Sequence, residues 1–432
     1  MREDDSNDGT AGAADPVEPG AWTLQLHDDP TQIDAAVWDA LLEASPSATP
    51  FMRHAYLAAL HASGSAAADT GWAPQFLTVE RDGQLAAACP LYLKSHSYGE
   101  YVFDWAWADA HERAGIRYYP KLLSAVPFTP VPGPRLLARD DASRALLLRG
   151  IEAFAKQNHL SSAHVLFLDE ADRHAAESAG WLLRSTVQFH WHNRGSRTET
   201  AGETQTEEGS GVGPGLTPYA DFADFLASLQ REKRKKIQQE RRYVREAGVS
   251  FESRLGAQIT STDWDFFYRC YTATYRAHRS TPYLSRDFFA RMAESMPGHW
   301  LLFTAHQGGS AIASSLIALD PQRGHAFGRY WGQLPGTPPI SCLHFEACYY
   351  QPLQWCIEQG YRRFEGGAQG EHKMARGLLP VRTHSAHWLA DARFADAVAR
   401  FLDREGAGVE AYVSELDERN PFKPHATEAL TP

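Results

Sequence analysis

Residues 300–319 read WLLFTAHQGGSAIASSLIAL, two strand-like runs joined by the turn Gln307-Gly308-Gly309. Residues 74–93 read PQFLTVERDGQLAAACPLYL, with the turn Arg81-Asp82-Gly83 in the same place. A glycine turn between two such runs is typical of a β-hairpin. The sequence therefore predicts one hairpin in each half of the chain, and their likeness predicts an internal duplication.

Each hairpin is followed by a helical stretch that leads into a further strand. The two halves then close on similar tetrapeptides, QFHW at 188–191 and SAHW at 385–388. The helix and strand of the first half are residues 145–157 and 164–168, and those of the second half are residues 345–359 and 362–364. A hairpin, a helix and a strand form an α/β (α+β) unit with a mixed sheet. We expect two such units in tandem, with a ligand cleft near their junction.

Two segments with little apolar content divide the chain. Residues 1–20 are rich in Asp, Gly, Ala and Pro, and residues 195–215 are rich in Thr, Glu, Gly and Ser. Such compositions do not form a core and favour disorder or a flexible connection. The predicted order is a disordered N-terminus (1–20), a first domain (21–193), a linker or insertion (194–215), a second domain (216–418) and a weakly ordered tail (419–432).

Composition narrows the class of protein. A net charge of −11 leaves polyanion binding to a local patch at most. No apolar run reaches the ~20 residues of a membrane-spanning helix, and the acidic start of the chain lacks the features of a signal peptide. The five cysteines are scattered without CxxC spacing, which is typical of reduced core thiols. We expect a cytoplasmic protein that does not span a membrane.

A basic stretch lies between the two units. Residues 231–245 read REKRKKIQQERRYVR, contain no Pro or Gly and are followed by Gly248, so they predict a helix. Arg234 and Arg241 fall on one face of this helix, which is suited to a phosphate-bearing partner such as an acyl-CoA, a nucleotide-linked precursor or tRNA. The alternative is a solvated helix that covers the sheet. Apart from Tyr243, no aromatic residues interleave with the cations as stacking platforms, and we expect no DNA binding.

The stretch GGAQGEHKMARG at 366–377 combines an open backbone with ionisable side chains. Glycines allow a close approach to a ligand and turns closed to other residues. Glu371 and His372 supply a candidate base and proton shuttle, and Lys373 and Arg376 supply cations. The alternative is an ordinary charged surface turn. Aromatic and ionisable residues crowd the flanking motifs, which supports a site: Arg329, Tyr330, Trp331, His344 and Glu346.

Metal and nucleophile chemistry have weaker support. His384 and His387 are three apart, but THSAHW at 383–388 reads as a strand, in which these side chains point to opposite faces. There is no GxSxG, Walker loop or GxGxxG in the sequence, and Cys342, Cys348 and Cys356 sit on or near an apolar helix. We predict no metal site.

Seven motifs occur in a fixed order along the chain. They are SYGEYVFD at 97–104, YYPKL at 118–122, PFTP at 127–130, the basic stretch at 233–242, GRYWG at 328–332, HFE at 344–346 and GAQGEHK at 367–373. With these motifs the chain resembles, from about residue 22 to 402, a bacterial family of predicted N-acyltransferases labelled peptidoglycan biosynthesis/recognition proteins. That family belongs to the GNAT-like superfamily and is related to the Fem aminoacyltransferases.

The resemblance implies two tandem GNAT-like domains with mixed central sheets flanked by helices. It also implies transfer of an acyl group from acyl-CoA, or of an aminoacyl group from aminoacyl-tRNA, to an amine, with no tightly bound cofactor. The usual GNAT pyrophosphate loop, Arg/Gln-x-x-Gly-x-Gly/Ala, is not clearly present, which keeps the tRNA donor in play. Cell-wall precursors are one class of amine acceptor.

We therefore predict an N-acyltransferase in which an amine attacks an activated acyl carbonyl. The amine has to lose a proton to a nearby carboxylate or imidazole. The first candidates for this role are Glu371 and His372, followed by Glu346 and Glu365. Backbone N–H groups of the glycine stretch are candidates to stabilise the developing oxyanion. The predicted substrate- and donor-binding residues are Arg329, Tyr330, Trp331, His344, Gly367, Gln369, Gly370, Lys373, Arg376, Glu100, Lys121, Arg234 and Arg241.

The first domain has no glycine stretch in the corresponding place. Residues 169–174 read DEADRH, an ordinary helix start with acidic residues in its first turn. Glu100 and Lys121 belong to its own distinctive motifs, which either line an acceptor cleft or pack the face between the domains. Two other classes stay open: a binding module for cell-wall precursors that carries out no chemistry, and a metal-dependent hydrolase.

Overall fold

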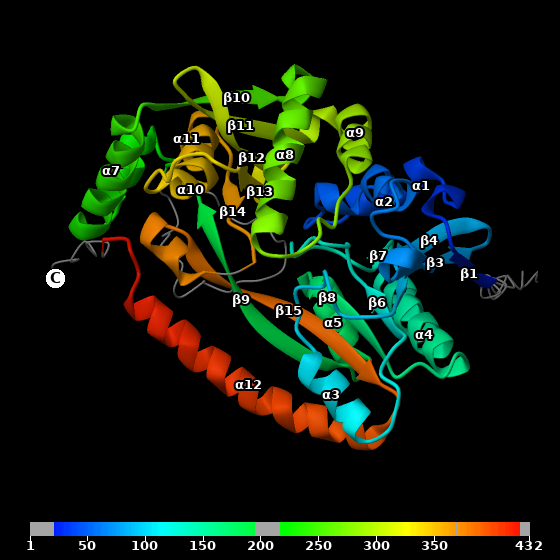
Figure 1. The fold of residues 1–432 in the computed structure, drawn as a ribbon. Coiled ribbons are helices and arrows are strands. Elements are labelled where there is room, and N and C mark those ends of the chain that lie inside the picture. The colour runs from blue at the N-terminus through cyan, green and yellow to red at the C-terminus, as the bar shows by residue number, and fades with distance from the viewer. Residues whose placement is uncertain (1–20, 195–216, 369, 424–432) are drawn as a thin grey trace, which may run out of the picture.

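The computed structural model describes residues 21–194, 217–368 and 370–423 (Figure 1). The expectations for residues 1–20, for most of the linker and for the end of the tail lie outside these ranges, as does Gln369. Among the described residues, no helix is both long and apolar enough to cross a membrane. All five cysteines are free thiols.

A large mixed sheet runs through the centre of the molecule. Within the described residues it holds eleven strands, in the order β10-β11-β12-β13-β14-β9-β15-β8-β6-β5-β2. The bounds are β10 Val249–Leu255, β11 Trp300–Gln307, β12 Ser310–Asp320, β13 His325–Gln333, β14 Arg363–Glu365, β9 Leu182–His192, β15 Leu379–Leu389, β8 Ser162–Leu168, β6 Lys121–Ser124, β5 Tyr92–Lys94 and β2 Trp72–Pro74.

The strand order has an approximate symmetry about its centre. On one side β13 and β14 are parallel neighbours, and on the other side β6 and β8 are parallel neighbours. Between these pairs lie the last strands of the two halves in exchanged positions, since β9 pairs with β14 and β15 pairs with β8. The prediction of two α/β units is confirmed, and the chain consists of two tandem units that share one sheet.

Both predicted hairpins form. β11 and β12 pair antiparallel across the glycine turn. In the first half, β3 (Phe76–Arg81) pairs with β4 (Gln84–Cys89) across Asp82 and Gly83, which both have positive φ. The first hairpin changes sheets at Gln75 and Pro90, because β3 and β4 join β1 (Trp22–His27) and β7 (Leu137–Ala138) in a separate four-stranded sheet, while β2 and β5 join the large one.

Helices cover both faces of the sheets (Figure 1). The basic stretch forms α7, as predicted, and buries Ile237, Glu240 and Val244. The helix bounds are α1 Ala35–Glu43, α2 His54–Ala62, α3 Trp105–Arg113, α4 Asp141–Gln157, α5 Glu170–Ser178, α6 Phe222–Ser228, α7 Arg231–Glu246, α8 Ser261–Ala277, α9 Arg286–Ser295, α10 Leu343–Phe345, α11 Gln351–Glu358 and α12 Ala392–Glu418. A π-helical turn, Glu346–Tyr350, joins α10 to α11, and short 3₁₀ turns are Pro30–Gln32, Pro50–Met52, Ala68–Thr70, Gly256–Gln258, Pro297–His299 and Glu371–Arg376.

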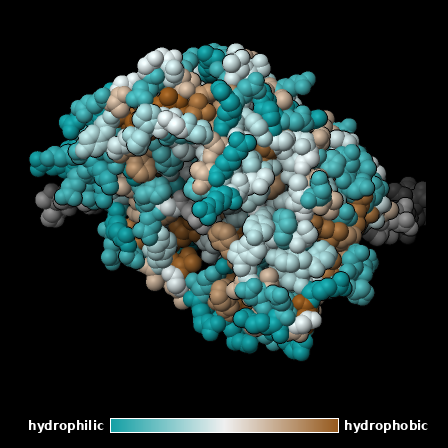
Figure 2. All heavy atoms as spheres, in the orientation of Figure 1, coloured by the Kyte–Doolittle hydropathy of each residue, from teal (hydrophilic) through white to brown (hydrophobic). Residues whose placement is uncertain are grey.

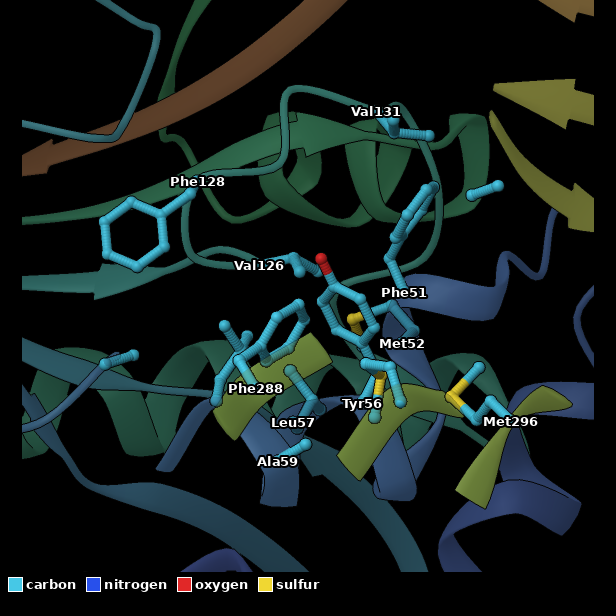
Figure 3. Packing of buried hydrophobic residues seen from close by; sticks show 14 of the residues in the cluster. Phe51, Met52, Tyr56, Leu57, Ala59, Val126, Phe128, Val131, Phe288 and Met296 are labelled. Carbon is cyan, nitrogen blue, oxygen red and sulfur yellow. The ribbon is translucent and has the colours of Figure 1, made fainter. Parts of the chain in front are cut away.

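The two halves share a hydrophobic core. Phe51 and Tyr56 of the first half pack edge-to-face against Phe327 and Phe288 of the second half, with ring centroids 5.2 and 5.4 Å apart. Figure 3 shows Phe288 of α9 beside Tyr56 of α2. Aromatic pairs in this geometry add to the stabilisation from burial, so the junction between the halves is a packed core.

The long helix α12 lies along β9 and β15, at the lower edge of the molecule in Figure 1. It buries Val398, Leu402 and Leu416, and Glu405 pairs with Arg184 of β9 at 2.7 Å. The C-terminal half thus covers the exchanged strands with its own helix. After α12, residues 419–423 return to the start of α7, where Gln230 N donates to Pro421 O.

Candidate functional site

The parallel strands β13 and β14 diverge and leave a cavity between them. They pair over residues 325–327 and 363–365, after which β13 continues while the chain leaves β14 at Gly366. The cavity has a volume of about 410 Å³. Its lining residues are Tyr101, Pro130, Tyr271, Thr274, Tyr275, His278, Ser280, Gly328, Arg329, Tyr330, Trp331, Gly367 and Ala368.

Both halves of the chain build this cavity. Tyr101 and Pro130 come from the first half, and the other lining residues come from α8, the turn that follows it, β13 and the glycine stretch. Helix α8 lies very close to β13, because a side chain at Gly332 would meet the backbone oxygen of Cys270 at 2.0 Å. Glycine is therefore required there, and it brings Tyr271 and Tyr275 to the cavity wall. The cavity agrees with the expected cleft near the junction of the units.

The glycine stretch adopts backbone conformations that few other residues tolerate. Gly367 has φ +87° and Gly370 has φ +118°, both unfavourable for residues with a Cβ. The N–H groups of Gly367 and Ala368 donate to no acceptor among the described residues, whereas Gly366 N donates to Phe189 O. Two free amides thus lie at the cavity wall.

Lys373 is buried directly behind this wall. Its Nζ donates to the carbonyl oxygen of Gly367 at 2.8 Å, and the side chain is only 2 % exposed. Burial lowers the pKa of Lys373 to about 8, because an ammonium ion loses its hydration there. The sequence prediction placed Lys373 at the site, and the structure puts it next to a lining residue.

Glu365 ends β14, two residues before the lining glycine Gly367. The side chain is buried and lies 2.9 Å from Arg363 Nη2 and 3.8 Å from His190 Nε2. Both carboxylate oxygens lack a hydrogen bond within the described residues. Burial raises the pKa of Glu365 to about 7. A carboxylate with this pKa is suited to accept a proton near neutral pH.

Arg329 is the only Lys, Arg, Asp or Glu among the described residues that line the cavity. Its Nη2 donates to the carbonyl oxygen of Phe128 at 2.8 Å, and its guanidinium lies 5.2 Å from the ring centres of Phe51 and Tyr330. Nε is buried without a hydrogen-bond partner within the described chain. The first half therefore orients Arg329 through the carbonyl of Phe128 and, at 3.5 Å, the hydroxyl of Thr129.

Two of the foremost candidates face away from the cavity. Glu371 is exposed and accepts hydrogen bonds from Tyr412 of α12 at 2.9 Å and from Arg419 at 3.3 Å. His372 is exposed too, and its Nε2 lies 3.3 Å from the hydroxyl of Tyr349. Neither side chain is among those that line the cavity. His344 packs against Trp331 and Tyr349 outside the lining set.

Three other candidates hold α7 in place. Arg241 of α7 pairs with the buried Glu346 at 3.0 Å. Arg376 pairs with Glu240 of α7 at 2.9 Å and lies 3.5 Å from the ring centre of Phe345. These side chains are used in internal contacts, which leaves the outer cations of α7, Arg234 among them, for a partner. Figure 2 shows hydrophilic side chains over the α7 edge of the molecule.

Glu100 and Lys121 lie in a separate buried cluster of the first half. Lys121 Nζ donates to Ser97 Oγ and Glu100 Oε2, each at 2.8 Å, and also to Asp104. Tyr101 lies between the two carboxylates in sequence, has φ +62° and reaches the cavity. The cluster thus holds the loop that presents Tyr101, while its charged members do not line the cavity.

The structure brings together a subset of the predicted residues. Arg329, Tyr330, Trp331 and Gly367 line the cavity, and Glu365 and Lys373 adjoin it. Sequence reasoning missed Tyr271 and Tyr275, although their four-residue spacing on a helical stretch marks one face. His384 and His387 lie on a strand, as predicted. Within residues 21–194, 217–368 and 370–423, no group of three or more His, Cys, Asp or Glu has the arrangement of a metal site.

Comparison with known proteins places the chain in a family. The model of the FemAB-like family, described as peptidoglycan biosynthesis/recognition, matches residues 29–201 and 216–424. These ranges cover most of the sequence, and the chain belongs to this family. Membership supports an acyl- or aminoacyltransferase class, as the sequence motifs implied. No curated protein matches the chain.

Several solved structures are similar in fold. FemX shares 9 % identity, with 85 % of this chain and 98 % of that chain covered and a TM-score of 0.49. L-PGS from Bacillus licheniformis shares 12 % identity, with 87 % and 98 % covered and a TM-score of 0.49. A tandem GNAT protein from the clavulanic acid biosynthesis pathway shares 10 % identity, with 86 % and 99 % covered and a TM-score of 0.42.

Proposed function

We propose that the chain is an N-acyltransferase whose reaction takes place in the cavity between β13 and β14. The observation that carries this proposal is Glu365, a buried carboxylate beside the cavity whose oxygens have no hydrogen bond within the described residues. Arg363 pairs with Glu365 at 2.9 Å, yet burial still raises the pKa of Glu365 to about 7, so its charge is only partly compensated and is unfavourable for stability. Its position beside a cavity makes this carboxylate a candidate for proton transfer.

The reaction is a direct displacement at an acyl carbonyl. The amine nitrogen of the acceptor forms a bond to the carbonyl carbon, and the bond from that carbon to the donor's sulfur or oxygen breaks. Glu365 takes the proton that the amine loses, and the leaving thiolate or alkoxide takes up a proton to give the free thiol or hydroxyl. The free N–H groups of Gly367 and Ala368 face the developing oxyanion.

Lys373 supports this arrangement from behind the loop. Its bond to Gly367 O fixes the peptide that carries the free N–H of Ala368. Its positive charge also lies close to the place where negative charge develops, and electrostatic stabilisation of this kind is often the largest single contribution to catalysis. This role replaces the direct substrate contact that the sequence suggested.

The donor is an acyl-CoA or an aminoacyl-tRNA, and the proposed setting is the cytoplasm. The outer cations of α7 provide a phosphate-binding surface, since Arg234, Lys235 and Lys236 make no ion pair among the described residues. A tRNA held through ~5 phosphates loses affinity steeply as salt rises, and a CoA much less. The salt dependence of binding by wild type and by the double variant Arg234→Glu/Lys236→Glu separates the two donors.

The acceptor is an amine, with cell-wall precursors as the class that the family description favours. The competing function is a module that binds such precursors without chemistry. The test is mass spectrometry of reactions that contain the protein, acetyl-CoA or an aminoacyl-tRNA, and a panel of amines. Formation of an amide that depends on the protein supports the proposal. Binding of precursors with no amide from either donor supports the binding module.

A further inference from the structure

The cavity has one positive charge and no opposing charge in its lining. Arg329 is the sole fully ionised side chain among the described lining residues, and no carboxylate forms an ion pair with it in the described chain. Nη2 is held by the carbonyl oxygen of Phe128, while Nε is buried and has no hydrogen-bond partner in the described chain. An arginine that is fixed in place and still has free donors is prepared for an anionic ligand.

The remaining lining is aromatic with polar edges. Tyr101, Tyr271, Tyr275 and Tyr330 surround Arg329, and the rings of Tyr271 and Tyr330 are 5.3 Å apart at a steep angle. Tyrosine offers an apolar face for packing and a hydroxyl for hydrogen bonds. A volume of about 410 Å³ lies at the small end of the range for ligand sites, so it admits one group of roughly amino-acid size.

The number of positive charges in the lining indicates which kind of anionic group the cavity binds. A phosphate ester carries up to two negative charges and is commonly bound by several cations or by a nest of N–H groups. Here one guanidinium is available, and the two free amides of the glycine stretch are already assigned to the oxyanion. A single carboxylate matches this charge. Lys373 is separated from the cavity by Gly367, to which it is hydrogen-bonded.

We infer that the amine acceptor carries a single carboxylate, which Arg329 binds against the tyrosine wall while the amine faces Glu365. The substrate class is an amino acid or a molecule with an amino-acid-like end. This inference rests on the proposed transfer reaction for the role of the amine. The carboxylate subsite itself is defined by Arg329 and the tyrosines, so it is testable without any donor.

The experiment measures equilibrium binding by ligand-observed NMR with wild-type protein and no donor. The probes are L-phenylalanine, L-phenylalaninamide and phenylphosphonate at millimolar concentration. The acid and the amide differ only in the anionic group. We expect L-phenylalanine to bind at least about tenfold more tightly than its amide, since a charge-assisted contact is lost, and phenylphosphonate to bind more weakly than the acid.

Variants then assign the preference to one residue. Arg329→Met should bring the acid and the amide within about twofold of each other, and Arg329→Lys should retain part of the preference. Arg362→Met is the matched control, because Arg362 is exposed in the turn before β14, and it should behave as wild type. Thermal unfolding of each variant is the control that checks whether the fold persists.

Four results would overturn the inference: equal affinity for acid and amide in wild type, a preference that survives Arg329→Met, tighter binding of phenylphosphonate, or no binding of any probe. None of them bears on amide formation in the transfer assay. Carboxylate binding without any transfer would instead leave this subsite in place and contradict the proposed function.

Discussion

The strands β8 and β14 hold equivalent places in the two halves, yet their C-terminal ends differ completely. After β8 the side chain of Asp169 accepts a hydrogen bond from Asp172 N and caps α5. After β14 the chain enters the glycine stretch, and the next helical element in the described chain is the 3₁₀ turn Glu371–Arg376. The first half closes its strand end with a capped helix, while the second half leaves it open to a cavity.

Two groups of buried charges illustrate the same division. In the first half Lys121 contacts Ser97, Glu100 and Asp104, so its positive charge is balanced. In the second half Glu365 has one cationic partner, Arg363 at 2.9 Å, and Lys373 Nζ has only a carbonyl partner in the described chain. Well-compensated buried charges hold a loop in place, whereas weakly compensated ones reduce stability and remain available for chemistry. One fold thus serves as scaffold in one half and as reactive site in the other.

The largest effect on stability is expected at Lys121. Lys121→Met leaves Glu100 and Asp104 buried without their cation, which should lower the free energy of unfolding by about 3–5 kcal/mol. Urea denaturation followed by fluorescence measures this loss. The control is Lys156→Met, which removes an exposed i,i+4 pair with Glu152 and should change stability by less than about 0.5 kcal/mol. A loss at Lys121 no larger than that of the control would contradict the comparison.

Replacing Glu365, in contrast, is expected to raise the free energy of unfolding. The pKa of Glu365 is raised from 4.5 to about 7 by burial, so its protonated form favours folding below pH 4.5, and this contribution disappears as pH rises through 7. Glu365→Gln keeps the side chain neutral. It should stabilise the protein at pH 8 by up to about 3 kcal/mol and have little effect at pH 5.

Thermal unfolding of Glu365→Gln at both pH values provides the measurement. Glu371→Gln is the matched variant, because Glu371 is exposed on the surface and its replacement should give no such difference. Equal stabilisation of Glu365→Gln at pH 5 and pH 8 would show that ionised Glu365 is not a source of instability.

The smallest expected change in stability comes from replacing single glycines, and it distinguishes backbone strain from loss of function. Gly180 and Gly367 have φ of +78° and +87°, and an added Cβ would clash at neither position. Each change to alanine should therefore destabilise by about 1 kcal/mol. Only Gly367→Ala distorts the cavity wall, and it should lower kcat/KM for amide formation by about tenfold. A similar loss in Gly180→Ala would mean that strain alone reduces activity.

Local signals in the sequence predicted much of this architecture. The glycine turns predicted the hairpins, and the uninterrupted basic stretch predicted α7. The alternation around His384 and His387 predicted part of β15. The exchange of β9 and β15 was not predictable, because pairing of strands nearly 200 residues apart leaves no local pattern. The break of the first hairpin at Pro90 has a local cause, since proline cannot donate to a ladder.

The sequence predicted which regions of the chain form the candidate site, but it predicted less well which side chains face the cavity. The glycine stretch and the motif at 328–332 do meet at one cavity. Side-chain direction depends on tertiary contacts, and α12 draws Glu371 outward through Tyr412, while Glu240 of α7 takes Arg376. The end of β14 turns Glu365 inward. Four carboxylates or imidazoles near one loop looked equivalent in the sequence, and packing distinguishes them.

The most direct test of the central claim is the pH dependence of kcat/KM for amide formation. If Glu365 is the base and protonated Lys373 assists, activity should rise through about pH 7 and fall above about pH 8, the values to which burial shifts their pKa. Glu365→Gln should lower the rate by at least about 100-fold and remove the rising limb, while Glu371→Gln should retain both rate and profile. A Glu365→Gln variant with wild-type rate and profile would contradict the account.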